Sequence, residues 1–156
     1  MVMRVTGIDP GLSGGIATLD GDEVIVVPLP VLNGRPDLHR IMLGNADFVC
    51  IERHGIRPGQ SANAVQTGGI NYGMLIGFLT VRAIPFEEVG PSVWKKAMGV
   101  SLCKGATAKQ KKEASIGLAL QLFPDTNLIL PGCRTYHDGM AEALLIAEYA
   151  RRHLCK

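Results

Sequence analysis

Residues 46–52 constrain the fold most, because an apolar run there ends directly on a carboxylate. The segment reads Ala-Asp-Phe-Val-Cys-Ile-Glu and closes at Glu52. Such a run is typical of a strand that is buried on both faces of a sheet. Residues 2–9, rich in β-branched side chains, predict a second strand that ends at Asp9, before a turn at Pro10 and Gly11. A strand buried on both faces needs other elements packed on either side, which indicates a layered fold.

The other periodic segments complete this fold. Residues 15–19 and 23–27, joined at Asp20-Gly21, predict a strand hairpin, and residues 82–89 predict a fifth strand. Helices are expected over residues 36–43, 61–81, 91–98, 107–122 and 138–153, with Ser61 and Thr107 as N-caps. No repeat or linker divides the 156 residues. We therefore expect residues 1–156 to form a single α/β domain, a mixed five-stranded sheet flanked by helices.

Composition excludes several classes of protein. A content of 47% hydrophobic and 19% charged residues is ordinary for a globular domain. No apolar run approaches the ~20 residues of a membrane span, and the N-terminus lacks a signal-peptide pattern, so we expect a cytoplasmic protein. Cys50, Cys103, Cys133 and Cys155 lie far apart without a CxxC pair, which predicts free thiols rather than a zinc site.

Positive charge is concentrated in one segment. The net charge is only +2, yet six of the seven lysines lie within residues 95–112, and residues 90–112 contain no Asp or Glu. A basic segment on a nearly neutral chain indicates a surface that meets an anion, with nucleic acid the first candidate. The alternative is a solvated lysine face that keeps the protein in solution.

Four acidic residues occupy positions that suit chemistry. Asp9 and Glu52 end expected strands, while Asp138 and Glu142 open the last expected helix and, four apart, project from one helical face. If the first and fourth strands are neighbours, all four acids meet in the crevice at the strand ends. Gathered carboxylates repel one another unless cations lie among them, and oxygen ligands suit Mg²⁺ or Mn²⁺. The alternative is a set of separate acids that cap turns or pair with arginines.

Such a cluster is a phosphodiesterase site in outline. Two divalent ions ~4 Å apart activate a water, hold the scissile phosphate and stabilise the leaving oxygen. We therefore predict that Asp9, Glu52, Asp138 and Glu142 are both catalytic and metal-binding. His137 is either a further participant or a simple helix cap. Trp94 either stacks on a base or anchors its short helix to the core.

Four sequence motifs resemble the RuvC-like Holliday junction resolvases (crossover junction endodeoxyribonucleases), especially the short phage versions. They occur in family order over nearly the whole chain. They are Gly7-Ile8-Asp9-Pro10-Gly11 with Ser13-Gly14-Gly15, then Ile51-Glu52, then Gly90-Pro91-Ser92-x-Trp94-Lys95-Lys96, and finally His137-Asp138-x-x-x-Glu142-Ala143-Leu144-Leu145-Ile146-Ala147.

The resemblance implies an RNase H-like fold, a homodimer and Mg²⁺-dependent cleavage of a four-way DNA junction. Asp9 and Glu52 match the family's first two metal-binding acids. The implied dimer uses the helix after Glu52, where Gly69, Gly73 and Gly77 form a stripe that lets another backbone approach. DNA contacts are expected from the basic segment and from the loop after Glu52, through Lys95, Lys96, Lys104, Lys109, Lys111, Lys112, Arg53 and Arg57.

Two departures from the bacterial pattern leave other functions open. The last acidic pair is spaced four apart instead of three, and residues 53–59 lack the aromatic wedge of bacterial members. A broader range of branched DNA substrates is therefore expected. The rivals are an RNase H-like nuclease acting on flaps or RNA, a catalytically inactive junction-binding module, and an actin-like ATPase, which needs two such lobes.

Overall fold

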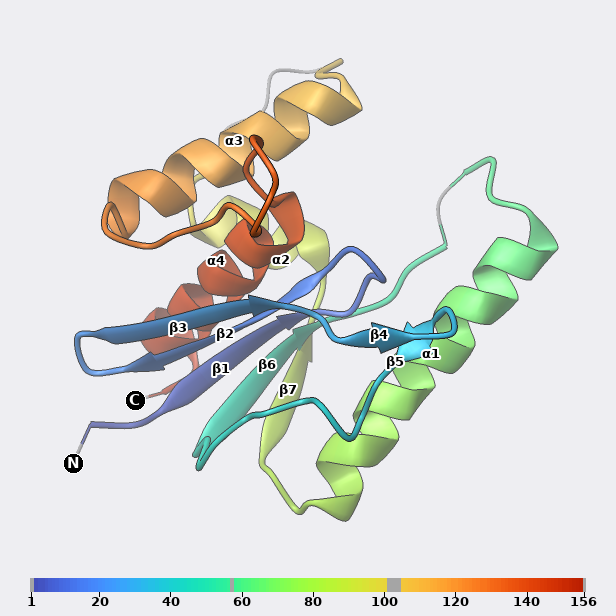
Figure 1. Cartoon of the computed structure of the whole chain (residues 1–156), viewed down its shortest axis with the longest axis horizontal. Coiled ribbons are helices and arrows are strands. Elements are labelled where there is room, and N and C mark those ends of the chain that lie inside the picture. The colour runs from blue at the N-terminus through green and yellow to red at the C-terminus, as the bar shows by residue number, and fades with distance from the viewer. Residues whose placement is uncertain (1, 57, 101–104, 156) are drawn as a thin grey trace.

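A mixed sheet forms the centre of the protein (Figure 1). The computed structural model describes residues 2–56, 58–100 and 105–155. Within these residues a five-stranded sheet has the order β3-β2-β1-β6-β7. Its strands are β1 (Val5–Asp9), β2 (Gly15–Asp20), β3 (Glu23–Pro28), β6 (Phe48–Glu52) and β7 (Phe86–Val89). β1, β2 and β3 pair antiparallel, whereas β6 and β7 run parallel to β1, so the predicted mixed five-stranded sheet is confirmed.

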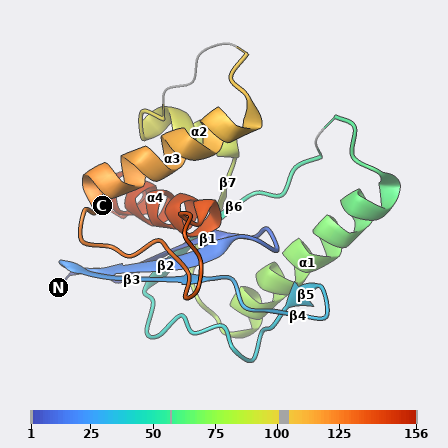
Figure 2. The ribbon, with the colours of Figure 1, turned by 45° about the horizontal axis from the view of Figure 1, so that its top comes forward.

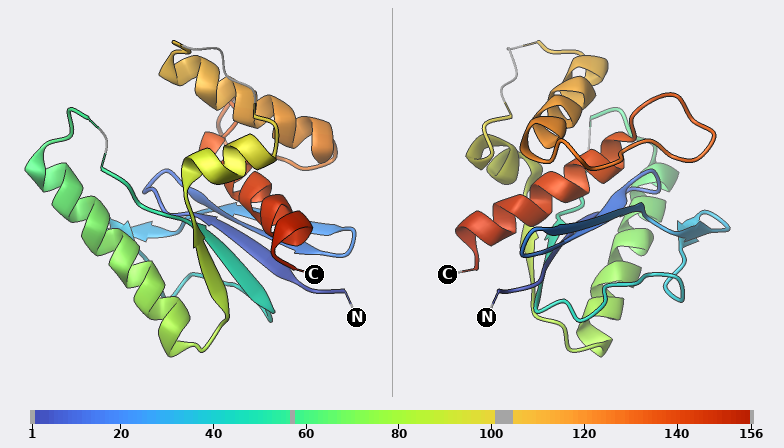
Figure 3. Two further views of the ribbon diagram at one scale, coloured as in Figure 1. Left: turned by 180° about the vertical axis from the view of Figure 1, so that it is seen from behind. Right: turned by 60° about the vertical axis from the view of Figure 1, so that its left-hand side comes forward.

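Helices cover both faces of this sheet (Figures 2 and 3). α4 (Asp138–His153) packs across β1 and β2, and α3 (Ala108–Leu122) packs on α4. α1 (Ala62–Val81) lies on the opposite face, and α2 (Pro91–Ala97) follows β7. Cys50 belongs to the core under α4, whereas Val49 and Ile51 belong to the core under α1. β6 is therefore buried on both faces, which explains its continuous apolar run.

Glycines allow α4 to touch the sheet backbone. A Cβ atom built on Gly7 would lie 2.3 Å from both the Ala143 carbonyl O and the Ala147 N. A Cβ atom on Gly139 would lie 2.1 Å from the Ser13 carbonyl O. No side chain fits between these backbones, so α4 lies directly on β1 and on the turn that leads into β2.

The helix starts follow the expected capping chemistry. Ser61 Oγ accepts the Ala64 N–H at 3.2 Å, and Thr107 forms a reciprocal capping box with Gln110. At the start of α4, His137 Nδ1 accepts the Met140 N–H at 3.1 Å. The cap interpretation of His137 is therefore the one that the structure supports.

The helix predicted over residues 36–43 is wrong. β4 (Val31–Leu32) and β5 (Arg35–Pro36) form a small hairpin instead, and residues 38–40 form a turn. Ile41 and Leu43 are buried, while Met42 between them is 83% exposed, so the apolar side chains alternate with a period of two. The missed signal is Asn33-Gly34, whose φ angles of 51° and 72° make the tight turn that this dipeptide favours.

The last strand is also shorter than predicted. β7 begins at Phe86, because Arg82 caps α1 and Ala83 turns the chain with a φ of 53°. Free thiols are confirmed for Cys50, Cys133 and Cys155, while Cys103 lies outside the described residues. Among the helices of the described ranges, none has the length and apolar character that a bilayer crossing requires.

We predict that Gly7→Ala will strongly destabilise the protein, because its new methyl group would displace the α4 backbone. The expected loss is about 3 kcal/mol of the free energy of unfolding, measured by urea denaturation. Gly117→Ala is the matched control, because this α3 glycine has open space around its Cβ position. The control should gain about 0.5–1 kcal/mol. Equal effects of the two substitutions would contradict the close seating of α4.

Candidate active site

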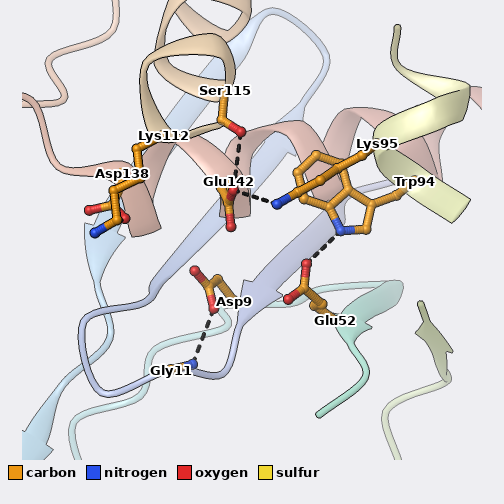
Figure 4. Close-up of polar contacts among 9 residues, drawn as sticks. All are labelled: Asp9, Gly11, Glu52, Trp94, Lys95, Lys112, Ser115, Asp138 and Glu142. Atoms are coloured by element: carbon orange, nitrogen blue, oxygen red, sulfur yellow. Dashed lines mark hydrogen bonds and ion pairs between the residues drawn. The ribbon is translucent and has the colours of Figure 1, made fainter. Parts of the chain in front are cut away.

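The first two predicted acids lie side by side at the ends of parallel strands. Ile8 of β1 pairs in register with Ile51 of β6, so the residues that follow, Asp9 and Glu52, reach the same edge of the sheet. The close seating of α4 brings Asp138 and Glu142 over this edge (Figure 4). The structure thus gathers the acids from three separate parts of the sequence.

Asp9 experiences the combined field of this cluster. The pKa of its carboxyl is raised from 3.8 to about 7, chiefly by burial. The Gly11 N–H, which donates to Oδ1 at 3.1 Å, acts in the opposite direction. The negative charges of Glu52, Glu142 and Asp138 are the smaller contributions to this rise in pKa. Near neutral pH Asp9 therefore holds a proton in part of the molecules, and positive charge nearby would release it.

Glu52 is fixed by a buried indole. Only 9% of Glu52 is exposed, and its Oε2 accepts a hydrogen bond from Trp94 Nε1 at 2.7 Å. Trp94 itself is fully buried, so it anchors α2 to the core, and the base-stacking alternative is wrong. This hydrogen bond was not predicted from the sequence. A buried indole N–H needs an acceptor, and that requirement was the available signal.

The two acids of α4 each pair with a lysine from the basic segment. Glu142 Oε1 accepts from Lys95 Nζ at 2.8 Å and from the buried Ser115 Oγ at 3.1 Å. Asp138 Oδ2 lies 2.8 Å from Lys112 Nζ. The hydrogen bond from Ser115 to Glu142 was not predicted from the sequence. Two of the lysines predicted to bind DNA therefore contact the acid cluster in this structure.

The other predicted DNA-binding residues lie around this cluster. Lys96, Lys109 and Lys111 are exposed on α2 and α3. Arg53 is exposed next to Glu52, and its guanidinium donates to the Glu88 carbonyl O at 3.3 Å. Arg57 and Lys104 lie outside the described residues. DNA binding by this set stays a prediction.

The donor set suits a hard divalent cation, although the side chains do not enclose one as they are placed. Among the described residues, no three His, Cys, Asp or Glu side chains form a group that could hold a metal ion. Lys95 and Lys112 form ion pairs with the two acids of α4. The alternative in which the acids pair with basic side chains is therefore partly correct, with lysines in place of arginines. Metal binding by the four acids stays a prediction.

Comparisons of the sequence find no match, whereas comparisons of the structure do. No protein-family model and no curated protein matches the sequence. T. thermophilus RuvC in complex with Holliday junction substrate has a TM-score of 0.59 at 18% identity, covering 96% of this chain and 95% of that one. The Thermus thermophilus RuvC structure has a TM-score of 0.56 at 19% identity, covering 96% of each chain.

A viral protein is similar to the same degree. Fowlpox virus resolvase, in complex with substrate Holliday junction DNA, has a TM-score of 0.56 at 16% identity and covers 99% of this chain and 100% of that one. These likenesses establish the fold of the chain. The predicted RNase H-like fold is confirmed.

The pKa of Asp9 predicts how stability depends on pH in the absence of metal. Between pH 3.8 and about 7 the unfolded chain has released this proton while the folded protein still holds it, so the free energy of unfolding falls as pH rises. Asp9→Asn should therefore stabilise the metal-free protein above pH 7. The gain has an upper limit of about 4 kcal/mol, because each pH unit between 3.8 and about 7 contributes at most ~1.4 kcal/mol.

Urea denaturation in a chelator at about pH 5 and about pH 8 measures this gain. Asp125→Asn, at an exposed acid in the loop after α3, is the control and should leave the pH profile unchanged. An Asp9→Asn protein that is less stable than the parent at the higher pH would show that the carboxylate is stabilising.

Proposed function

We propose that this protein is a metal-dependent endonuclease that cleaves Holliday junctions and other branched DNA. One observation carries the proposal, the convergence of Asp9 and Glu52 with the α4 acids at one edge of an RNase H-like sheet. The fold is shared with RuvC and the fowlpox virus resolvase, whose structures contain Holliday junctions. Strand-end carboxylates that hold divalent cations, beside a basic segment that binds DNA, would suit hydrolysis of a phosphodiester.

Asp9, Glu52, Asp138 and Glu142 would hold Mg²⁺, with Mn²⁺ as a substitute. Divalent cations at such a site lower the pKa of a bound water and stabilise the charge on the leaving oxygen. Trp94 keeps the Glu52 carboxylate oriented through its hydrogen bond. Lys95 and Lys112 balance the charge of the α4 acids, and as flexible cations they can transfer to phosphate oxygens of bound DNA.

The DNA surface in this proposal runs from the acid cluster along α2 and α3. Lys96, Lys109 and Lys111 are exposed there, and lysine contacts phosphate as a point charge without reading bases. Tyr136, 48% exposed, precedes the capping residue of α4 in a loop tied by a bridge to Ile129. It offers an exposed aromatic ring on which a base could stack.

We further propose that a second copy of the chain packs on α1. Gly69, Gly73 and Gly77 have open space at their Cβ positions, and Ile70 beside them is 43% exposed. A helix with this surface can meet its copy across a two-fold axis at short range. Two active sites related by that axis would nick a two-fold junction symmetrically.

We predict that Asp9→Asn and Glu52→Gln will each lower the rate of junction cleavage in Mg²⁺ by at least about 10³-fold. Loss of several kcal/mol of charge stabilisation at the reacting phosphate has this effect. Binding of the junction, measured by gel shift in Ca²⁺ or chelator, should be retained because the lysines remain. Denaturing gels of synthetic four-way, three-way, flap and RNA substrates would measure cleavage.

Paired nicks in opposite strands of the four-way junction would support the proposal. Faster cleavage of flaps or RNA would favour the rival nuclease function. No cleavage of any substrate by the parent protein, despite binding, would favour an inactive junction-binding module.

We predict that Lys96→Ala combined with Lys111→Ala will weaken junction binding and flatten its salt dependence. The slope of log K against log salt should shrink by about 2, since each phosphate contact contributes about 0.9. Fluorescence anisotropy over a salt series measures it. Arg82→Ala, at the exposed C-cap of α1, is the control and should keep the parent slope. A double variant with the parent slope would remove α2 and α3 from the interface.

A further inference from the structure

β3 forms one margin of the central sheet, and no strand of the described residues lies beyond it (Figure 1). Residues 24–27 of this strand read Val-Ile-Val-Val, which are side chains that favour strands. Proteins usually protect such a margin with charged side chains, because an open strand edge invites pairing with another chain. The opposite margin has this protection, since Glu87 and Glu88 occupy the middle of β7. The middle of β3 carries no charge.

The unpaired backbone groups of β3 follow from its pairing with β2. Leu29 donates its N–H to the Gly14 carbonyl O at 3.0 Å, which continues the register of the two strands. Bonded pairs alternate with non-bonded pairs in an antiparallel ladder, so Val27 also bonds to β2. Val24 and Val26 therefore turn their N–H and C=O groups away from β2. The described part of the chain supplies no other backbone partner for these groups.

A hollow lies on each face of this open strand. One, of about 710 Å³, is lined by Val24 and Val26 together with the loop after α3 and the end of α4. The other, of about 680 Å³, is lined by Ile25 and Val27 together with residues 42–44. Successive side chains of a strand point to opposite faces, and residues opposite each other in a ladder share a face. A strand added beside β3 would therefore place its side chains alternately over the two hollows.

The hollow that Val27 lines is apolar, and we call it the apolar hollow. Four of its apolar side chains are 40% to 83% exposed, namely Ile25, Val27, Val31 and Met42. Among its charged side chains, Arg4 pairs with Asp20, while Glu23 and Arg40 have opposite charges. This hollow therefore offers apolar surface to an incoming side chain without a net charge.

The hollow on the side of α4 is acidic, and we call it the acidic hollow. Asp22 and Asp125 line it, and both are exposed. Neither belongs to an ion pair within the described residues. Arg151, the one basic side chain among the described residues of this lining, already contacts Glu148 and the Gly21 carbonyl O. A basic side chain from outside would therefore meet complementary charge here.

We infer that β3 binds an extended segment of a partner protein in which apolar residues alternate with lysine or arginine. The backbone of this segment would bond to the outward groups of Val24 and Val26, as in other cases of strand addition. Its apolar side chains would cover the apolar hollow, and its basic side chains would reach the acidic one. A second copy of the chain is a poorer fit, because its β3 carries Glu23 and no basic residue.

This surface is separate from the candidate active site. Asp9 lies opposite Gly15 at one end of β2, whereas Val24 lies opposite Leu19 toward the other end. None of the four acids lines either hollow. The inference is therefore independent of the proposed nuclease function, and neither depends on the success of the other.

Fluorescence anisotropy of a short labelled peptide, in which valine alternates with lysine, tests the inference. The peptide should bind with a dissociation constant in the micromolar range. A peptide of the same composition with its valines in one block should bind at least about tenfold more weakly, because its side chains no longer match the two faces. Only alternate residues of an added strand bond to β3, so N-methylation of the valines and N-methylation of the lysines should change the affinity unequally, by at least about tenfold.

Substitutions in the protein locate the peptide. Val27→Lys, which brings a charge to the apolar hollow, should weaken binding by at least about tenfold. Val81→Lys is the matched control at an exposed valine of α1 and should keep the parent affinity. Asp22→Lys reverses a charge at the exposed turn before β3 and should also weaken binding by about tenfold, even if Val27→Lys fails to fold. Glu87→Lys, exposed on the opposite margin, is its control.

Three results would overturn the inference. They are no binding of the alternating peptide at millimolar concentration, equal losses from the two N-methylations, and parent affinity in the folded variants of both hollows. Sedimentation separates the other occupant, since Val27→Lys and the parent protein should have the same oligomeric state. Self-association that Val27→Lys abolishes would show that a second copy occupies β3, and the partner segment would then be wrong.

Discussion

The contact between the backbone of α4 and the backbones of β1 and β2 determines the rest of the structure. It exists because Gly7, Gly15 and Gly139 carry no side chain where the two surfaces meet. Even one methyl group there would overlap main-chain atoms, and main chain moves only by shifting the whole helix. Asp138 and Glu142 lie in the first turns of α4, so the glycines determine how closely these acids approach Asp9. This contact between backbones therefore determines how the acids of the candidate site are arranged.

Bringing the acids together has an electrostatic cost, which the basic segment offsets. Lys95 on α2 and Lys112 on α3 pair with Glu142 and Asp138, and burial leaves Asp9 with a raised pKa. The segment predicted to meet DNA is thus also the one that neutralises the acid cluster. In the proposed enzyme a phosphate and a carboxylate compete for the same lysine. Binding of DNA and binding of cations by the acids would then be thermodynamically linked, because each changes the charge that the other meets.

Sequence alone located the four acids because each lies where local patterns are strong. Asp9 and Glu52 end apolar strands, and Asp138 begins a helix whose bounds were predicted as observed. The ion pairs of Lys95 and Lys112 depend on how α2 and α3 cross α4, which no local period encodes. The bond from Trp94 to Glu52 joins residues 42 apart in the sequence, so only the fold reveals it. The helix at residues 36–43 was predicted wrongly because Ile41 and Leu43 are buried while Met42 between them is exposed, an alternation that a helix does not have.

α1 combines two surfaces that ordinary amphipathic helices do not need. In a helix that only covers a sheet, apolar residues form one stripe and the other face is polar. Here only Asn71, Leu75 and Leu79 are buried, and Figure 3 shows the N-terminal turns reaching past the ends of the strands. Asn63, Thr67 and Asn71 on one face of α1 line a cavity, while Gly69, Gly73 and Gly77 have open space on another face. Residues 62–70 of α1 are exposed or half-buried, so we expect little packing within one chain to stabilise them. In the proposed dimer, a second copy on the glycine stripe would bury a face of α1 that the single chain leaves exposed.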